Sequence, residues 1–369
     1  MSAQFTVKDA ISKLVAMEGD LSDYEANAAM EEIMDGVATP SQIASFLTAI
    51  RMKGASVAEL TAFAAAMKRH ALKISPKVNS RLVDTCGTGG DKMKTFNVST
   101  VAAIVTAGAS VPVAKHGNRS FTSKCGSADL MEKLGVNINA DPPTVQASIE
   151  QANIGFMFAP VFHPAMKNVG VPRKEIGIRT VFNMLGPLTN PAGSKAQVVG
   201  VYDSALVLQL ARVLKGLGVE DAMVVHGVDG IDEISLVGKT LVARVSGEKE
   251  IHEEMLDPLS SFGLKPRTIE EVSAAGADLE MYALTAFNIL SQSDSSLTPK
   301  ERATKEMILM NSSAALVTSG KVDNYNEGVE MAKSSVNSGN AFEKLVSLVK
   351  LTKGDPSRIE SLTKKSGKI

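Results

Sequence analysis

The amino-acid sequence predicts an α/β fold class, with a small all-helical N-terminal domain followed by a large α/β domain. The first observation is a run of helix start signals over residues 1–72, where strand signals are absent. The second is an alternation of strand-like and helical patterns from about residue 80, which predicts a mostly parallel central sheet flanked by helices. We therefore place the domains at 1–72 and 73–369, with a segment near 165–187 that returns to the helical domain.

The helical domain is predicted from local start and stop signals. Three pairs of residues fit a capping box: Ser22 with Glu25, Thr39 with Gln42, and Ser56 with Glu59. Pro40 suits the first position of a helix, and Gly36 and Gly54 suit helix ends. Apolar residues recur at helical spacing between these signals. The alanine-rich faces of these helices fit a monomer core and a contact with a second copy of the chain equally well.

The larger part of the chain reads as strands alternating with helices. Apolar, strand-like runs occur at residues 81–84, 111–114, 154–159, 197–202 and 222–226. Helical patterns lie between them, at residues 101–107, 128–134, 143–151 and 205–217. In parallel sheets of this kind, ligands bind beyond the carboxyl ends of the strands. The polar motifs described below follow these runs.

The segment from Asp84 to Thr100 joins a strand-like run to a helical run through three glycines within four residues, ending at Gly90. Glycine lets the backbone approach a ligand closely, and Ser99 and Thr100 stand where unpaired amides at a helix start attract anions. The segment lacks the Gly-Lys-Ser/Thr of a Walker loop and the third glycine of a dinucleotide fingerprint. A phosphate site and a plain tight turn are therefore both open from this segment alone.

A second polar loop is predicted directly after the run at 111–114. It reads Lys115-His116-Gly117-Asn118-Arg119-Ser120, and cations, an amide and a hydroxyl beside a glycine suit an anionic ligand better than a solvated loop. Ser127 stands at the start of the next helical run, where it is either a plain N-cap or a second phosphate contact.

Two later segments add charged groups. Arg173 has the planar fork that pairs with a carboxylate, whereas His163 is interpreted as a loop or core histidine. The Asp229-Gly230 pair is a strong hairpin signal, and Asp232 and Glu233 follow it. Adjacent carboxylates suit Mg²⁺, which takes one or two carboxylates together with substrate phosphates and water.

Composition excludes several classes of partner. The net charge of −1 gives no global field for nucleic acid, and no apolar run reaches the length of a membrane span. The N-terminus lacks a signal-peptide pattern, and the two cysteines, Cys86 and Cys125, show no metal-binding or disulfide spacing. We expect a cytoplasmic protein with reduced thiols.

Eight motifs in order resemble the anthranilate phosphoribosyltransferase family, which belongs to the superfamily of phosphoribosyltransferases and nucleoside phosphorylases. They cover most of the chain: Gly87-Thr88-Gly89-Gly90-Asp91, Asn97-Val98-Ser99-Thr100, Lys115 to Ser120, Gly126-Ser127-Ala128-Asp129, His163-Pro164-Ala165-Met166-Lys167, Arg179-Thr180 with Phe182-Asn183, Gly186 to Pro191, and Asp232-Glu233. The resemblance implies transfer of phosphoribose from phosphoribosyl pyrophosphate (PRPP) to the amine of anthranilate, releasing pyrophosphate, in tryptophan biosynthesis. It also implies two Mg²⁺ ions per active site and a homodimer formed through the N-terminal helices.

The resemblance also assigns roles to single residues. It implies Lys115, Asn118 and Arg173 as catalytic, and Gly87, Asn118 and Arg173 as contacts to anthranilate. Ser99 would bind one Mg²⁺, and Asp232 with Glu233 the other. PRPP would be held by Gly87, Gly90, Asp91, Thr95, Asn97, Val98, Ser99, Thr100, Lys115, His116, Gly117, Asn118, Arg119, Ser120 and Ser127. Lys92-Met93-Lys94 and the order Val171-Pro172 depart from the family pattern.

Alternative functions remain beside this one. A pyrimidine nucleoside phosphorylase would use free phosphate and would not need the acidic pair. A non-catalytic, nucleic-acid-binding relative should be basic and steeply salt-dependent, which the net charge of −1 does not favour. A transferase that acts on another aromatic amine is a third possibility.

Overall fold

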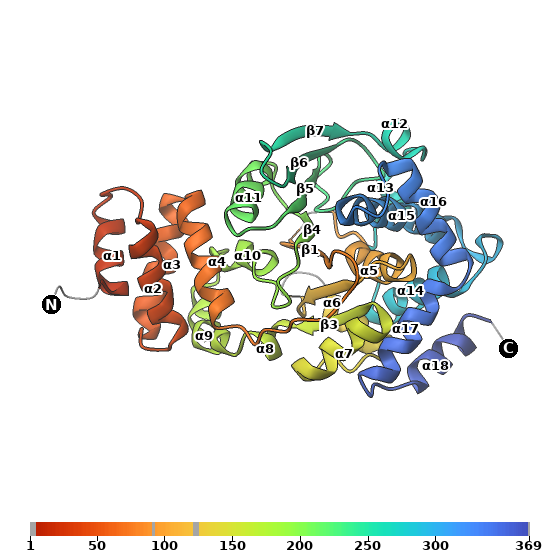
Figure 1. Ribbon diagram of the computed structural model, residues 1–369, viewed down its shortest axis with the longest axis horizontal. Coiled ribbons are helices and arrows are strands. Elements are labelled where there is room, and N and C mark those ends of the chain that lie inside the picture. Colours follow the sequence, from red (N-terminus) through yellow and green to blue (C-terminus); the bar gives the residue numbers. More distant parts are fainter. Residues whose placement is uncertain (1–4, 91–92, 121–124, 368–369) are drawn as a thin grey trace.

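A computed structural model describes residues 5–90, 93–120 and 125–367 of the chain. A bundle of short helices lies at one end and an α/β unit forms the rest (Figure 1). The sheet of this unit lies between the bundle and the C-terminal helices. The predicted fold class is confirmed.

The N-terminal helices begin at the capping boxes that the sequence predicts. They are α1 (Val7–Val15), α2 (Asp23–Met34), α3 (Pro40–Lys53) and α4 (Val57–Arg69). In α2, for example, Ser22 Oγ accepts from Glu25 N at 3.3 Å, and Ser22 N donates to Glu25 Oε2 at 2.8 Å. α1 begins with a fourth capping box, between Thr6 and Asp9. The sequence analysis did not predict it, because aspartate stands where a capping box usually has glutamate or glutamine.

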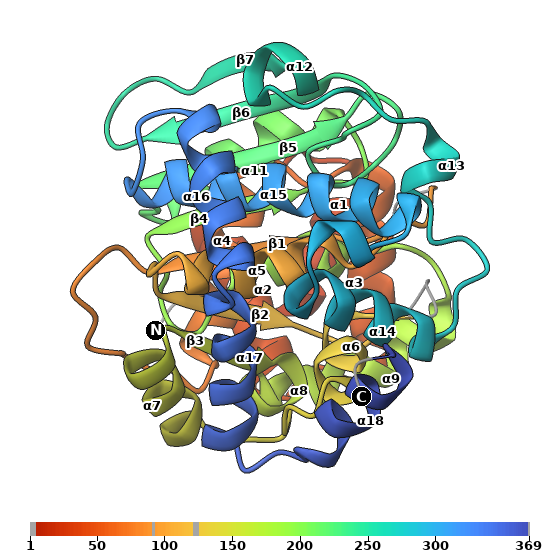
Figure 2. The same ribbon diagram turned by 90° about the vertical axis from the view of Figure 1, so that its right-hand side faces the viewer.

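The sheet has seven strands in the order β3-β2-β1-β4-β5-β6-β7 (Figure 2). Its strands are β1 (Val83–Gly87), β2 (Val113–Gly117), β3 (Ile154–Phe158), β4 (Ala196–Gly200), β5 (Asp221–Gly227), β6 (Thr240–Ser246) and β7 (His252–Leu256). Strands β1 to β5 run parallel to one another, whereas β6 is antiparallel both to β5 and to β7. The sequence did not predict β6 and β7.

Two predicted strand boundaries were wrong, and the error matters for the site. The runs at 81–84 and 111–114 become β1 and β2, each of which ends three residues later than predicted. Lys115, His116 and Gly117 therefore lie in β2 and not in a loop after it. The predicted turn at Asp229-Gly230 forms, since Gly227 N bonds to Ile231 O at 2.8 Å, but the paired strands are β5 and the more distant β6.

Helices cover both faces of the sheet. One face packs on C-terminal helices and α5, the other on α11 and the N-terminal bundle (Figure 1). The remaining elements are α5 (Val98–Gly108), α6 (Ser127–Lys133), α7 (Pro142–Ala152), α8 (Ala159–Phe162), η1 (Pro164–Met166), α9 (Lys167–Ile176), α10 (Phe182–Leu185), η2 (Gly186–Leu188), α11 (Ala205–Gly216), α12 (Pro258–Phe262), α13 (Ile269–Val272), α14 (Leu279–Ser291), η3 (Asp294–Ser296), α15 (Pro299–Ser319), α16 (Tyr325–Asn337), α17 (Asn340–Leu351) and α18 (Ser357–Lys365).

The segment between β3 and β4 returns to the N-terminal bundle. Val169 of α9 and Phe182 of α10 are buried in the same core as α1 to α4. Asn168 Nδ2 donates to Met34 O at the end of α2, at 2.9 Å. This packing joins α9 to the ends of the N-terminal helices. Across the ranges that the structure describes, no helix is both long enough and apolar enough to span a bilayer.

Candidate active site

The strand order places a topological switch point at the carboxyl end of β1, where open α/β sheets form their ligand-binding crevice. From β1 the chain continues to β2 and β3 on one side, and it then returns to β4 and β5 on the other. The connections after β1 and β4 therefore diverge, which is the position where open α/β sheets bind ligands. Gly87 and Gly200, the last residues of these two strands, are register partners.

The glycine loop is fixed to the end of β4. Thr88 N donates to Gly200 O at 2.9 Å, and a Cβ atom on Gly87 would lie 3.2 Å from the same carbonyl oxygen. Gly89 and Gly90 have φ of +63° and +87°, a conformation that side chains other than glycine rarely adopt. Gly87 is exposed, so backbone is open to a ligand at this point. Asp91, predicted to hold PRPP, lies outside the described residues.

Helix α5 directs its amino end at the same crevice. The side chain of Asn97, the N-cap residue, accepts no hydrogen bond from the first amides of the helix. Asn97 therefore does not satisfy these amides. Ser99 N donates instead to Glu233 Oε1 at 3.2 Å. Asn97 donates from Nδ2 to Cys125 O at 3.1 Å, while its buried Oδ1 finds no partner in the described part of the chain. Val98 and Thr100 are buried in the first turn of the helix, and Thr95 precedes it.

The acidic pair reaches the crevice from the connection between β5 and β6. A Cβ atom on Gly200 would lie 1.7 Å from Asp232 O, so only glycine lets this connection pack on the end of β4. The side chain of Asp232 also faces Gly87, because a Cβ there would lie 3.8 Å from Asp232 Oδ2. Burial, and then the charge of Asp232, raise the pKa of Glu233 to about 8. A bound cation would favour the ionised carboxylate and so counteract both effects on the pKa of Glu233.

The residues present fit Mg²⁺. Glu233 bonds to Ser99 at the start of α5 and Asp232 faces Gly87 at the end of β1, and hard oxygen ligands completed by phosphates and water suit this ion. In the described ranges no group of three or more His, Cys, Asp or Glu side chains could hold a metal by itself. The donors therefore favour an ion that binds together with a phosphorylated ligand.

Lys115 is a buried cation beneath this site. Its side chain extends from β2 to β1, where Nζ donates to Thr85 O at 2.6 Å, and the residue is 2% exposed. Burial lowers the pKa of Lys115, while the charges of Asp84, Cys86 and Glu233 act in the opposite direction. The ammonium is therefore held among acidic groups at the carboxyl ends of the strands.

Hydrogen bonds from side chains replace part of the backbone hydrogen-bond ladder between β1 and β2. Only Val83 and Val113 are register partners, whereas β1 and β4 pair at five positions. Beyond them, His116 N donates to Asp84 Oδ1 at 3.2 Å, and Asn190 Nδ2 donates to Asp84 Oδ2 at 2.7 Å. Asn190 Nδ2 also donates to Ala114 O at 2.8 Å. The sequence analysis did not predict the contact between Asp84 and Asn190. A charged residue in an apolar strand-like run was nevertheless a signal of a buried polar contact.

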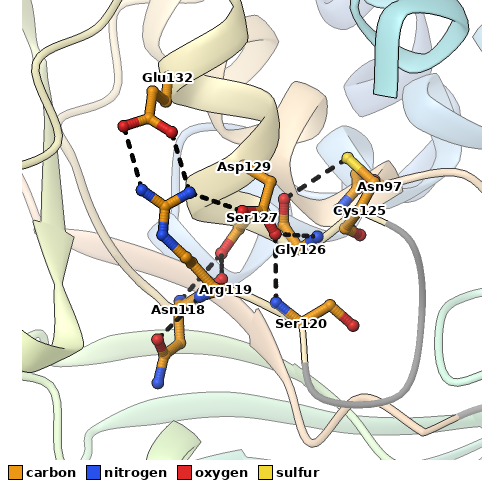
Figure 3. Close-up of polar contacts among 9 residues, drawn as sticks. All are labelled: Asn97, Asn118, Arg119, Ser120, Cys125, Gly126, Ser127, Asp129 and Glu132. Carbon is orange, nitrogen blue, oxygen red and sulfur yellow. Dashed lines mark hydrogen bonds and ion pairs between the residues drawn. The ribbon is translucent and has the colours of Figure 1, made fainter. Parts of the chain in front are cut away.

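Figure 3 shows a second cluster, around the loop after β2. Asp129 of α6 accepts from Gly126 N at 2.9 Å and from Ser120 N at 3.3 Å, which closes the loop. Asn118 N donates to Ser127 Oγ at 3.1 Å, and Ser127 Oγ donates to Asn118 O at 3.2 Å. Ser127 is the first residue of α6 and Gly126 its N-cap, so the N-cap interpretation of Ser127 was wrong. Gly117 ends β2 where a Cβ would lie 2.3 Å from Ser127 Oγ.

Arg119 is exposed, but its side chain is held by carboxylates of α6. Its guanidinium pairs with Asp129 at 2.7 Å and with Glu132 at 2.9 Å (Figure 3). These carboxylates raise the pKa of Arg119. The contact of Arg119 with PRPP, which the family resemblance implies, stays a prediction, and binding would have to compete with two acidic partners.

His116 and His163 form a buried pair with ring centroids 5.0 Å apart. Burial lowers the pKa of His116 to about 3 and that of His163 to about 4. Neither Nε2 atom has a hydrogen-bond partner in the described part of the chain. The interpretation of His163 as a core residue agrees with its 4% exposure.

We expect His163 to make the protein sensitive to acid. Its pKa in the fold is below its ordinary value, so its contribution to stability is present above pH 6.5 and is lost as pH falls towards 4. Between pH 7 and 5.5 the wild type should lose about 1 kcal/mol of unfolding free energy through this group. Urea unfolding at both pH values measures the loss, and it should shrink in His163→Gln. An equal loss in the variant would contradict the assignment.

Arg173 lies on a third element, α9. The helix continues through Pro172, so the Val171-Pro172 order does not break it, and it ends at Gly177 with φ +65°. The Arg173 guanidinium stands 5.3 Å from the ring centroid of Phe182, and burial lowers the pKa of Arg173. A partly buried arginine fixed on an aromatic ring is well placed for a carboxylate ligand.

Two protein-family models match the chain. The model described as "Glycosyl transferase family, a/b domain" matches residues 79–342, and "Glycosyl transferase family, helical bundle domain" matches residues 8–71. Among curated relatives, anthranilate phosphoribosyltransferase of Methanocorpusculum labreanum is 47% identical, over 93% of this chain and 97% of the relative. The enzyme of the same name from Methanosphaerula palustris is 48% identical, over 95% and 99%.

Solved structures agree with these relatives. Anthranilate phosphoribosyltransferase from Thermus thermophilus has a TM-score of 0.85 and 37% identity, covering 94% of this chain and 99% of its own. The yeast enzyme in complex with PRPP and Mg has a TM-score of 0.84 and 29% identity, covering 94% and 98%. The yeast enzyme has also been solved with 4-fluoroanthranilate, at a TM-score of 0.83 and 29% identity, covering 94% and 97%.

Proposed function

The chain belongs to the anthranilate phosphoribosyltransferase family, and from this premise we propose that it transfers the 5-phosphoribosyl group of PRPP to the amine of anthranilate. The products are N-(5-phosphoribosyl)anthranilate and pyrophosphate, in the second step of the tryptophan branch. The observation that carries the proposal is the convergence of the α5 amino end, the glycine loop and the acidic pair on one crevice. A doubly phosphorylated sugar with Mg²⁺ needs these groups together.

The proposed PRPP site extends over several strand ends. The exposed backbone at Gly87 and the first turn of α5 offer amides, and a helix start favours anions. The remaining contacts that the family implies come from the segment before α5, from β2 and the loop after it, and from the first residue of α6. We propose two Mg²⁺ ions, with Ser99 as a ligand of one and Asp232 and Glu233 as ligands of the other. Mg²⁺ would neutralise part of the negative charge of the diphosphate.

The residues of this chain fit a mechanism based on positioning and electrostatics. Breaking the bond from C1 of the ribose to the diphosphate leaves positive charge on the sugar and negative charge on the leaving group. Lys115, buried near Glu233, can stabilise that negative charge. The amine of anthranilate is neutral at pH 7, so no strong general base is needed. Asn118 and Arg173 would hold the amine in line with C1.

A fluorescence assay of anthranilate consumption tests the proposed reaction. Anthranilate should disappear only when the protein, PRPP and Mg²⁺ are all present. Release of a base from a pyrimidine nucleoside that depends on free phosphate would instead identify a nucleoside phosphorylase. Consumption that does not depend on PRPP would contradict the proposal.

We expect Arg173→Ala to raise the KM for anthranilate about 10-fold or more. The variant loses a charge-assisted hydrogen bond to the carboxylate, and such a bond contributes about 1.5–3 kcal/mol. The KM for PRPP should change much less. Lys174→Ala, which removes the exposed neighbouring cation, is the control. An unchanged KM for anthranilate in Arg173→Ala would remove this residue from the site.

We also propose that the protein forms a homodimer through its N-terminal helices and acts in the cytoplasm. The bundle leaves large apolar side chains exposed, among them Met17 (84%), Met52 (83%) and Val15 (69%). The buried thiols Cys86 and Cys125 suit a reducing compartment. A monomer in analytical ultracentrifugation at micromolar concentration would contradict the dimer.

A further inference from the structure

Arg179 is an exposed arginine that connects three parts of the proposed site. Its Nη2 donates to Gly90 O, in the glycine loop, at 3.0 Å. Its guanidinium also lies over the ring of Tyr202, 4.3 Å from the centroid, just after β4. Arg179 itself follows Gly177, the residue that ends α9, by two positions. One side chain therefore links the glycine loop, the end of β4 and the helix of Arg173.

The backbone conformation at Gly90 favours glycine, and the mobile end of the Arg179 side chain lies close to it. A Cβ atom on Gly90 would lie 2.7 Å from Arg179 Nη2, and Gly90 has φ of +87°. The contact with β4 is reinforced by a separate bond, because Tyr202 N donates to Thr88 Oγ1 at 3.2 Å. The loop is thus held to the end of β4 both by its own hydroxyl and through Arg179.

Arg179 carries a charge that no carboxylate among the described residues pairs with. Its contacts within residues 5–90, 93–120 and 125–367 are instead with a carbonyl oxygen and an aromatic face. An exposed contact of this kind adds little to global stability. A contact between two substrate-binding segments can still contribute to function, because it makes the position of one segment depend on the other.

We propose that Arg179 is a positioning residue that couples the binding of the two substrates. A diphosphate that orders the glycine loop fixes Gly90 O, and Gly90 O fixes Arg179. Arg179 in turn restrains the turn at Gly177, whose N donates to Arg173 O at 3.3 Å. Occupation of the diphosphate site therefore orients Arg173 for the carboxylate of anthranilate, and the reverse holds by linkage. This inference rests on the proposed function.

Calorimetry of anthranilate binding, with and without Mg²⁺ and pyrophosphate, tests the coupling. Pyrophosphate stands in for the diphosphate of PRPP and prevents turnover. In the wild type it should tighten anthranilate binding about 5-fold or more, which is the lower end of common coupling. In Arg179→Ala this factor should fall towards 1, while anthranilate binding without pyrophosphate changes less than about 2-fold. The melting temperature should stay unchanged.

Four further variants separate coupling from a general structural effect. Tyr202→Leu should lower the coupling factor as Arg179→Ala does, and the double variant should show no additional loss. Arg179→Lys, which keeps a donor for Gly90 O without the planar stack, should retain part of the factor. Arg212→Ala, which removes an exposed arginine from α11, should leave the factor intact.

The outcomes distinguish this inference from the proposed function. A coupling factor that is the same in Arg179→Ala as in the wild type, or a factor of 1 in the wild type, would overturn the positioning role while the enzyme assignment stands. A wild-type protein that does not bind anthranilate under either condition would overturn both.

Discussion

Lys115→Met is expected to lower kcat about 10²–10³-fold, the loss typical of removing one preorganised group that stabilises developing charge. Lys115 is 2% exposed, and its ammonium lies between Thr85 O and the acidic groups at the strand ends. Methionine keeps most of the volume of the side chain but cannot stabilise the diphosphate as it leaves. The loss should appear in kcat rather than in the KM for anthranilate, because the amine does not contact this residue.

A buried lysine elsewhere in the chain controls for the loss of stability. Lys305 of α15 is 4% exposed and pairs with Asp294 at 2.5 Å, far along the sequence from the proposed site. Lys305→Met should lower the midpoint of urea unfolding, as Lys115→Met also should, because each removes a buried ammonium and the hydrogen bond that it donates. Only Lys115→Met should lower kcat per folded molecule. A kcat within 3-fold of the wild type, on the order of experimental scatter in such comparisons, would remove Lys115 from the mechanism.

The place of Lys115 shows what the sequence could and could not predict. The types of residue and their order along the chain pointed to an anion site near the strand ends. The sequence did not reveal that Lys115 lies inside β2, because the end of a strand is fixed by its partner. Here the partner is β3, which pairs with β2 along its whole length and places Lys115 opposite Phe156, 41 positions along the chain.

Helices and strands differ in the same way in how well the sequence predicts them. Helix starts depend on residues that are close in sequence, whereas strands depend on partners that are distant in sequence. The capping boxes of α2, α3 and α4 depend on residues three positions apart, and the sequence predicted each of them. Strand β7 reads His-Glu-Glu-Met-Leu, which carries no strand signal, and it forms because β6 supplies the ladder. Its charged side chains suit the edge of a sheet. Arg119 is a similar case, since only the fold shows that Glu132 and Asp129 bind it.

The double variant Asp232→Asn with Glu233→Gln is expected to lose most of its turnover at low Mg²⁺, by about 10²-fold, and to recover part of it at high Mg²⁺. Amide oxygens keep the shape of the ligands but remove the negative charge that attracts the ion. A second adjacent acidic pair, Glu270 and Glu271 at α13, provides the control. Converting that pair to glutamine should leave the Mg²⁺ dependence unchanged.

The pH dependence of Mg²⁺ activation gives an independent measurement on the same pair. Because the pKa of Glu233 is raised to about 8, its carboxyl group carries a proton at pH 7 in the metal-free protein. A metal ion must displace that proton, so the Mg²⁺ concentration for half-maximal rate should fall as pH rises from 6.5 to about 8 and then level off. In the double variant this dependence should be flat, since neither amide titrates. An unaltered Mg²⁺ requirement in the double variant, with the wild-type pH dependence, would place the metal at other residues and leave the acidic pair as part of the connection that packs on Gly200.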